Sequence, residues 1–418
     1  MGILLAIRLV LIYSAFVFGG LYVLYLCHKY KDNNRLCYKF IHFLCAIFPL
    51  LDTKINVGDG WLVGAYLTAV FIIFNSRILK GINLKSFSLI YMLIVSYFLS
   101  ALFSEFPVDS LLSIYKYLTG FIIFFISIRA VRYKGLSYMA DMVMRYVTFW
   151  TLLFFCIQLF DKDFSLLTFF QEVAVGRLVS CYQDSQVSGL VTAILATYYF
   201  NKYLAEGKNK FGLLVLVLTV FIGLTGSKSG LLGEGAGLVV SLFFHKAPIK
   251  LIVLTPVFML GLILTQPLWS ELATVQRMQD LGKSKDTRMF YWAHAVSIYE
   301  KNPVVGVGPG CFKRYITEHK IPMKHFHGGD NIYADQPESG YLMWLDESGT
   351  IGALAYLLLL VYLFVLRGKG NYNISLIMPF LVSCVGLYTL RYFSVVLVLF
   401  SLISYMYIVK GKSRQYLN

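Results

Sequence analysis

Two acidic residues stand directly before a long apolar run, in the segment DQPESGYLMWLDESGTIGALAYLL. Asp335 and Glu338 have the D-x-x-E spacing of a helix N-terminus, and Pro337 suits the first turn, so Glu338 is predicted to close a capping box. The same position also suits chemistry, because a carboxylate held ionised by the helix dipole can accept a proton. The residues alone favour the capping box and leave a catalytic role of Glu338 open.

A lysine stands where two apolar runs meet, in the segment GLTGSKSGLLGEGAG. Lys228 can offer a point charge to a phosphate, and equally it can extend its ammonium group to the membrane surface as a structural residue. Glu234 lies deeper in the same run, where a carboxylate requires a partner that the sequence does not identify. Close helix packing accounts for the glycines, which stand at 226, 230, 233 and 237.

Arginines can recognise a diphosphate, because a planar guanidinium group makes two parallel hydrogen bonds to it. Four stand on or near the side opposite the basic clusters described below: Arg177, Arg288, Arg314 and Arg391. For each of them singly, a structural salt bridge is the alternative, with Asp184, Asp286 and Glu318 as the nearby acids. Convergence of several arginines would favour a binding site.

The histidines and cysteines do not form a recognisable metal motif. His319, His325 and His327 are close in sequence, but no H-E-x-x-H motif or cysteine ligand accompanies them. Cys181 and Cys311 are expected on the same outer side and are predicted to be unpaired. We therefore expect neither a metal nor another cofactor.

The elements that position these residues are predicted to be membrane-spanning helices. Of the 418 residues, 58% are hydrophobic and 14% are charged, which leaves too little polar surface for a soluble protein of this size. The net charge of +15 does not indicate nucleic-acid binding, because the lysines and arginines stand between apolar runs, two runs apart, as the positive-inside rule predicts. Thirteen runs are long enough for helices: 9–27, 38–51, 60–75, 86–104, 111–128, 139–160, 187–200, 211–226, 229–244, 250–267, 340–366, 374–390 and 392–409. The predicted fold is an all-α bundle of about 12–14 spans.

Two outer loops are long enough to carry function. We expect transmembrane helices over 1–267 with a medium loop at 161–186, one large extramembrane loop over 268–339, and further transmembrane helices over 340–418. Within the large loop, DTRMFYWAHAVSIYEKNP predicts a helix that Asp286 or Thr287 caps and that ends before Pro303. The following VVGVGPG is rich in turn residues and does not fit a dinucleotide-binding fingerprint.

Four segments, in this order, resemble the bacterial Wzy-type polymerases of O-antigen and capsule repeats and their relatives, the O-antigen ligases. These segments are GRLVSCYQDSQVSGLV, LTGSKSG, RMFYWAHAVSIYEKNPVVGVGPGCF and ESGYLMWLDESGTIGALAYLL. The ligases typically have His-Asn where Glu338 and Ser339 stand, and this departure favours a polymerase. Relatives commonly have arginine at Lys228, so the charge is kept but the two-pronged geometry is lost.

The resemblance implies a helical membrane glycosyltransferase that acts without a metal. Donor and acceptor would be glycans on undecaprenyl diphosphate, used at the periplasmic face of the bacterial inner membrane. Glu338 would accept the proton of the attacking hydroxyl, and Arg288 would stabilise the charge of the leaving diphosphate. Arg177, Lys228 and Arg314 would bind the diphosphate or substrate. Membrane lipid and a chain-length regulator are the other expected partners, and nucleic acid is not.

Two other functions stay open from the sequence. An O-antigen ligase would transfer the glycan to lipid A core, using similar motifs. A lipid-linked sugar transporter or flippase belongs to a different class and would show repeated halves with polar residues at mid-membrane. No repeat is visible, and the polar residues gather towards one side, which favours the enzyme.

Overall fold

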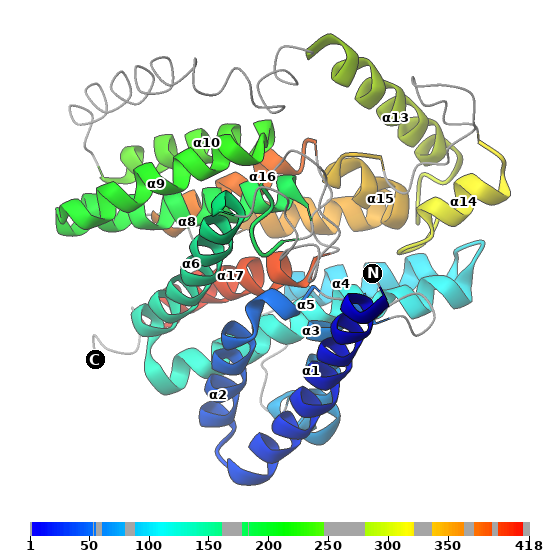
Figure 1. Ribbon diagram of the computed structural model, residues 1–418. Helices are drawn as coiled ribbons and strands as arrows, with labels where there is room; N and C mark the ends of the chain where they lie inside the picture. Colours follow the sequence, from blue (N-terminus) through cyan, green and yellow to red (C-terminus); the bar gives the residue numbers. More distant parts are fainter. Residues whose placement is uncertain are drawn as a thin grey trace.

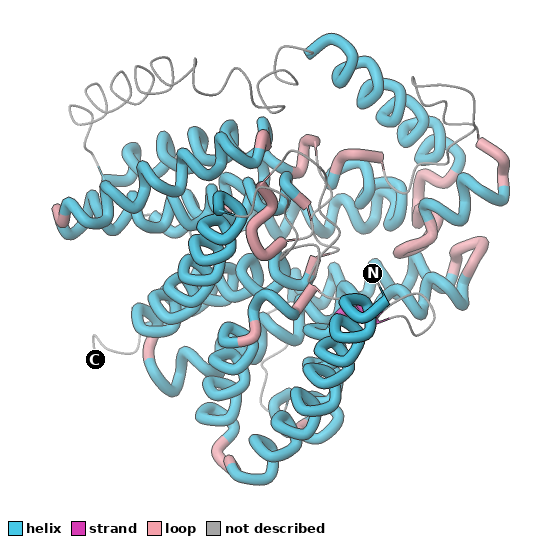
Figure 2. Tube along the Cα trace, viewed as in Figure 1, coloured by secondary structure: helices cyan, strands magenta, loops and turns pink. Residues whose placement is uncertain are grey.

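The computed structural model describes ten stretches of the chain: 2–52, 54–55, 61–79, 88–160, 178–182, 184–245, 281–321, 337–362, 372–386 and 392–412. Helices account for most of these residues, as Figure 2 shows by its colouring. The only strands in the described stretches are β1 (Lys54–Ile55) and β2 (Trp61–Leu62), which pair antiparallel in a two-residue ladder. The predicted all-α class is therefore confirmed.

The helices of the N-terminal half are α1 (Gly2–Lys29), α2 (Asn33–Ala46), η1 (Phe48–Leu50), α3 (Val63–Phe74), η2 (Ser76–Leu79), α4 (Ser88–Leu102), α5 (Pro107–Lys134), α6 (Leu136–Phe160) and α8 (Ser185–Glu206). Those that follow are α9 (Asn209–Thr225), α10 (Lys228–His245), α13 (Leu281–Lys301), α14 (Phe312–Glu318), α15 (Gly340–Val361), η5 (Tyr372–Leu376), α16 (Met378–Ser383) and α17 (Phe393–Lys412).

Three described helices are long and apolar enough to cross a membrane, namely α5, α6 over Leu136–Leu159, and α15. They overlap the predicted spans at 111–128, 139–160 and 340–366. Shorter apolar helices accompany them, among them Phe16–Lys29, Val63–Phe74 and Ser88–Leu102. Large apolar side chains also face outward, as at Ile73 (73% exposed) and Phe243 (80% exposed), which a lipid environment covers. The chain is an all-α membrane protein, and the total of 12–14 spans stays a prediction; the expected span at 250–267 lies outside the described residues.

Helix α8 forms the packed centre of one half of the molecule, since every residue from Val187 to Asn201 is buried. It packs against α9 and α10, and α10 in turn packs against α16 (Figure 1). In the other half, α5 lies against α2, α4 and α17, while α15 connects α4 with α13. Helices α13 and α14 lie at the right of Figure 1, and both contact α15.

The glycines of α10 confirm close helix packing. A Cβ atom at Gly230 would lie 2.9 Å from the backbone of Gly189 in α8, and one at Gly233 would lie 2.9 Å from the backbone of Pro379 in α16. Gly237 faces Thr197 of α8. Gly226 has a different role, because its left-handed conformation (φ 66°) ends α9. The small side chains let α10 approach both α8 and α16 closely.

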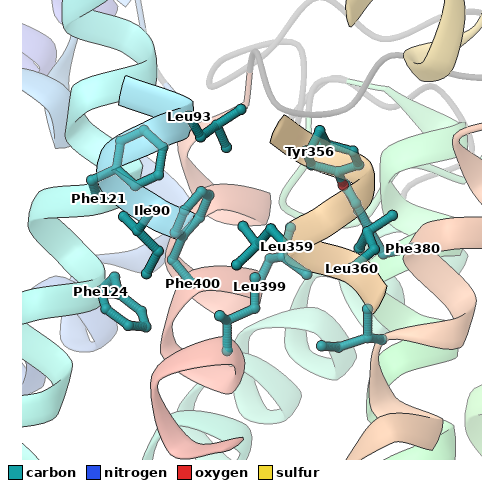
Figure 3. Close-up of a pocket in the computed structure, with 12 residues that line it drawn as sticks. Ile90, Leu93, Phe121, Phe124, Tyr356, Leu359, Leu360, Phe380, Leu399 and Phe400 are labelled. Atoms are coloured by element: carbon teal, nitrogen blue, oxygen red, sulfur yellow. The ribbon is translucent and has the colours of Figure 1, made fainter. Parts of the chain in front are cut away.

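An apolar cavity lies between α4, α5, α15 and α17 (Figure 3). Phe121 and Phe124 line it from α5, Tyr356 and Leu360 from α15, and Phe400 from α17. The lining belongs to helices that are distant in sequence, so the cavity is a product of tertiary packing.

The start of α17 is capped from a distant part of the chain. Asp52, which is 2% exposed, accepts a hydrogen bond from the backbone N–H of Ser394 at 3.1 Å. Burial raises the pKa of Asp52, while the hydrogen bonds from Ser394 act in the opposite direction. This carboxyl group satisfies one of the free amides at the helix N-terminus.

Candidate functional site

Glu338 lies just outside α15 and does not form the predicted capping box. The helix begins at Gly340, and Ser339 is its N-cap, with its side chain accepting a hydrogen bond from Leu342 N at 3.5 Å. Glu338 adopts a left-handed backbone conformation (φ 53°), so it precedes the cap, whereas a capping-box glutamate stands three residues after it. The prediction failed because Ser339 replaces Asp335 as the cap. Pro337 is likewise outside the first turn.

Glu338 acts electrostatically on α13, the helix that contains Arg288. Burial raises the pKa of Tyr291, and the negative charge of Glu338 raises it further. Helix α13 also packs against α15, as Figure 1 shows. Residue 288 stands three positions before Tyr291, about one helical turn away. Residue 288 therefore lies about one helical turn from a tyrosine whose pKa is raised by the charge of Glu338.

The predicted boundaries of α13 are correct at one end and wrong at the other. The helix ends at Lys301, before Pro303, as predicted. Its start is Leu281, so Asp286 and Thr287 lie inside the helix and do not cap it. Local cap signals were overridden here because the helix continues N-terminally through GKSK, whose lysines are good helix formers.

Lys228 is the first residue of α10, and this helix end lies close to the start of α15. The C-terminal end of α16 connects them: the hydroxyl of Ser383 donates to Ser229 O at 3.4 Å, and Gly340 N donates to Cys384 O at 2.7 Å. The hydroxyl of Ser339 also reaches Cys384 O, at 3.3 Å. Two helix N-termini, with Lys228 at one and Glu338 beside the other, therefore meet at the end of α16.

The electrostatics of α10 favour an anion beside Lys228. Ser227 accepts a hydrogen bond from Gly230 N at 3.1 Å and so satisfies one amide of the first turn. The positive end of the helix dipole disfavours a cation at this position and favours a negative charge. The partly buried lysine adds its own positive charge to that of the helix end. The combination is suited to a phosphate or diphosphate.

Sequence reasoning missed two buried acids, Asp346 and Glu347, inside α15. They are 0% and 1% exposed. Glu347 accepts a short hydrogen bond from the hydroxyl of Tyr117, whereas neither carboxylate oxygen of Asp346 has a hydrogen-bond partner among the described residues. The signal was present, because two adjacent ionisable residues in an apolar run indicate function in a membrane protein.

The backbone of the loop after α13 forms hydrogen bonds with the backbone at these two acids. Val307 N donates to Asp346 O at 2.8 Å, Gly308 N donates to Glu347 O at 3.0 Å, and Thr350 N donates to Pro303 O at 2.8 Å. The residues VVGVGPG thus pair with LDESGT, which the sequence showed only as two separate motifs. The loop occupies carbonyl groups that the distorted helix cannot use internally.

This pairing requires a glycine on each side. Helix α15 is kinked at Gly349, where φ is 61° and ψ is −166°. Gly306 also has positive φ (73°), and a Cβ atom on either glycine would collide with the backbone of the other segment. Glycine is the residue that tolerates both the conformation and the close approach.

Arg314 is held by one acid near the start of α5 and by one on its own helix, α14. Its guanidinium group forms a short ion pair with Asp109 and lies 3.8 Å from Glu318. It also lies 4.6 Å from the ring centroid of Phe106. The salt-bridge alternative with Glu318 is therefore confirmed, and the binding role of Arg314 stays a prediction.

Several other predicted residues have a clear outcome. Glu234 is buried and accepts a hydrogen bond of 2.5 Å from the hydroxyl of Thr219 in α9, which identifies the partner that the sequence left open. His319 lies 2.9 Å from Glu105, so it has an acidic neighbour. The remaining predicted residues are outside the described part of the chain: Arg177, His325, His327, Asp335 and Arg391.

Comparison with protein families matches residues 213–357 to the family described as O-antigen ligase. The matched region runs from α9 to α15 and includes Lys228, Arg288 and Glu338, while Arg177 precedes it. A search of the curated proteins finds no match. Residues 213–357 thus match the O-antigen ligase family model, and this match is consistent with the superfamily of O-antigen ligases and polymerases.

Proposed function

We propose that this membrane protein is a polysaccharide polymerase that joins oligosaccharide repeat units carried on undecaprenyl diphosphate. The observation that carries the proposal is the junction at the end of α16, where the start of α10 at Lys228 meets the start of α15 beside Glu338. The effect of Glu338 on Tyr291, three residues after position 288 in α13, supports it. A base for a hydroxyl group and cations for a diphosphate are the two requirements of such a transfer.

The reaction needs one bond to form and one to break. The hydroxyl oxygen of the acceptor sugar bonds to the anomeric carbon of the donor, and the bond from that carbon to the diphosphate breaks. The proton of the hydroxyl passes to Glu338, and undecaprenyl diphosphate leaves with the electron pair. Arg288, Lys228 and Arg177 offset the developing negative charge, which makes a general acid unnecessary.

The buried acids of α15 have a positioning role in this proposal. Asp346 and Glu347 lie in α15, whose start follows Glu338. The loop after α13 donates hydrogen bonds to the backbone carbonyl groups of these two residues. We expect these hydrogen bonds to fix the position of α13 relative to α15. A shift of about 1 Å between a base and a charged group is enough to slow a reaction substantially.

A polymerase is favoured over a ligase by the residue at position 338. The ligases typically carry His-Asn where this chain has Glu338 and Ser339, and here the serine serves as the helix cap. The proposed location is the inner membrane, with the site at the periplasmic face. A chain-length regulator and membrane lipid are proposed as partners.

The test uses purified protein with purified lipid-linked repeats, with and without lipid A core. Polymer formed from repeats alone supports the proposal, whereas transfer that occurs only with lipid A core identifies a ligase. Movement of the lipid-linked repeat across vesicles without any new glycosidic bond identifies a transporter. Surface glycan of a deletion strain gives a second measurement: a single repeat on core supports a polymerase, and unattached polymer supports a ligase.

A further inference from the structure

A group of exposed cations at the ends of α1, α2 and α5 is not used by the proposed function. We define this basic patch as Lys29, Lys31, Arg35, Arg132 and Lys134, all of which are exposed. They come from two connections that are about a hundred residues apart in sequence, and the packing of α2 on α5 brings these connections together. Both connections lie in the lower half of Figure 1, away from α13.

The patch is unusual because its positive charge is not compensated. Within the described stretches, none of its five cations forms an ion pair with a carboxylate. The only acid in the α1–α2 connection, Asp32, caps α2 by accepting a hydrogen bond from Asn34 N at 3.0 Å. A cluster of like charges without counter-charges favours an anionic ligand.

The neighbouring cations at α6, α8 and α9 differ in this respect. Lys202 lies 2.8 Å from Asp141, and Lys208 lies 2.7 Å from Glu206. Arg145 lies 3.5 Å from Asp141. The positive-inside rule explains why lysines gather at all of these connections, but it does not explain why one group is paired and the other is left unpaired.

Tyrosine rings contact three of the five cations of the patch. The ammonium group of Lys134 lies 5.8 Å from the ring centroid of Tyr38 in α2 and 5.3 Å from that of Tyr133. On the other side, Lys29 lies 5.8 Å and Arg35 lies 5.0 Å from the ring centroid of Tyr30. Cation–π contacts restrict these side chains without neutralising their charge.

The patch lies at the ends of apolar helices, where a membrane surface is expected. Lys134 is the last residue of α5, which is long enough to cross a membrane, and α6 begins two residues later at Leu136. Lys29 ends the apolar helix Phe16–Lys29. Tyr25, Tyr133 and Tyr138 are 49%, 38% and 50% exposed beside the cations, as expected of aromatic residues at the headgroup layer.

We propose that the basic patch is a binding site for the phosphate headgroup of an anionic phospholipid. Positive side chains contact the phosphate, and the exposed tyrosines contact the glycerol backbone and the start of the acyl chains. Each lysine or arginine near an anionic bilayer contributes about a factor of five in binding. The site is separate from Glu338 and Lys228, so a variant of the patch is expected to keep the chemistry of the proposed transfer.

The test measures binding of phosphatidylglycerol to the full-length protein in detergent, by native mass spectrometry and by thermal unfolding, with phosphatidylcholine as the neutral comparison. The double variant R35Q/K134Q removes two charges from the patch. The matched control K208Q/K210Q removes two charges from exposed lysines of the α8–α9 connection. We expect R35Q/K134Q to weaken phosphatidylglycerol binding roughly 25-fold, and the control to weaken it less than about 3-fold.

Two further variants distinguish a loss of lipid binding from a failure of the protein to fold. R35K/K134R keeps both charges and is expected to restore binding, and K29Q/K31Q offers a second way to neutralise the patch. Unchanged phosphatidylglycerol binding in both neutral variants overturns the proposal, as does an equal loss in K208Q/K210Q. One more result overturns the proposal. In that result, wild-type protein binds phosphatidylglycerol and phosphatidylcholine equally, and an acidic protein binds to the patch through Arg35 and Lys134.

Discussion

At the scale of single residues, Glu338 is the residue whose interpretation the structure changed most. The sequence favoured a capping box, but the helix begins at Gly340 and Ser339 caps it. The capping-box explanation for a glutamate at 338 is therefore removed. Its charge also raises the pKa of Tyr291 in α13, and proton acceptance is the role that we propose for it.

We expect Glu338→Gln to lower the polymerisation rate roughly 100-fold or more, because glutamine cannot accept the proton of the hydroxyl. The amount of folded protein should change little, since Glu338 lies before the helix cap. The measurement is polymer made from purified lipid-linked repeats at matched protein concentration.

Ser339→Ala is the matched control for this substitution. It removes the cap and should cost about 1 kcal/mol of stability while leaving the proton acceptor in place. Equal rates for wild type and Glu338→Gln would exclude Glu338 as the base.

A second residue-scale prediction concerns Arg288. Arg288→Ala is expected to abolish polymer at a near-normal protein level, because a cation that meets the leaving diphosphate contributes mainly in the transition state. Arg288→Lys should recover part of the rate, since it keeps the charge but loses the planar geometry. Lys301→Ala, an exposed cation at the end of the same helix, should have little effect. Normal polymer length in Arg288→Ala would remove this residue from the site.

At the scale of elements, the loop after α13 and the kink of α15 form one unit. We expect Gly349→Ala to destabilise the protein by roughly 1–3 kcal/mol, because φ is positive there and the added methyl group meets the backbone at Val304. Melting temperature in detergent is the measurement.

Gly235→Ala is the control for this element, because it makes the same substitution in α10, where a Cβ atom meets no other atom within 4 Å. It should leave the melting temperature unchanged or raise it slightly. A Gly349→Ala protein as stable as wild type would show that the kink is not required.

The cap of α17 by Asp52 predicts a pH dependence. Because burial raises the pKa of Asp52 above its usual value of 3.8, the folded state favours the protonated form more than the unfolded state does. The contribution of Asp52 to stability is complete below about pH 4 and is lost as pH rises through the folded-state pKa. The melting temperature of wild type should therefore fall, relative to that of Asp52→Asn, between pH 4 and pH 7. A difference that stays constant, or that changes in the opposite direction, contradicts this prediction.

At the scale of the whole molecule, the positive-inside pattern predicts an orientation. Single-cysteine variants at Lys313 and Lys208 in intact cells can test it, because an impermeant reagent reaches only the outer side. We expect labelling at 313 and none at 208. Figure 1 shows the α8–α9 connection and α14 at opposite sides of the molecule, which makes the two positions suitable probes. Strong labelling at 208 with none at 313 would reverse the orientation.

The sequence by itself determined the class of the protein and several local features. Long apolar runs require helices in a membrane, because the lipid offers no hydrogen bonds to the backbone. The glycine spacing of α10 and the end of α13 before Pro303 also follow from neighbours within one or two turns. The segments around Lys228, Arg288 and Glu338 indicated the superfamily before the arrangement of the helices was considered.

Only the tertiary structure decided how these segments meet. Asp52 caps α17 through Ser394, which lies 342 residues later in sequence, and no local pattern records such a pair. The same holds for the pairing of Val307 and Gly308 with the kink of α15, and for the meeting of the ends of α10, α15 and α16. The cap at Ser339 was also decided in this way, because its hydroxyl and the amide of Gly340 both bond to Cys384 O. Helix ends expose unpaired backbone groups, and the partner that satisfies them is set by the packing of the whole chain.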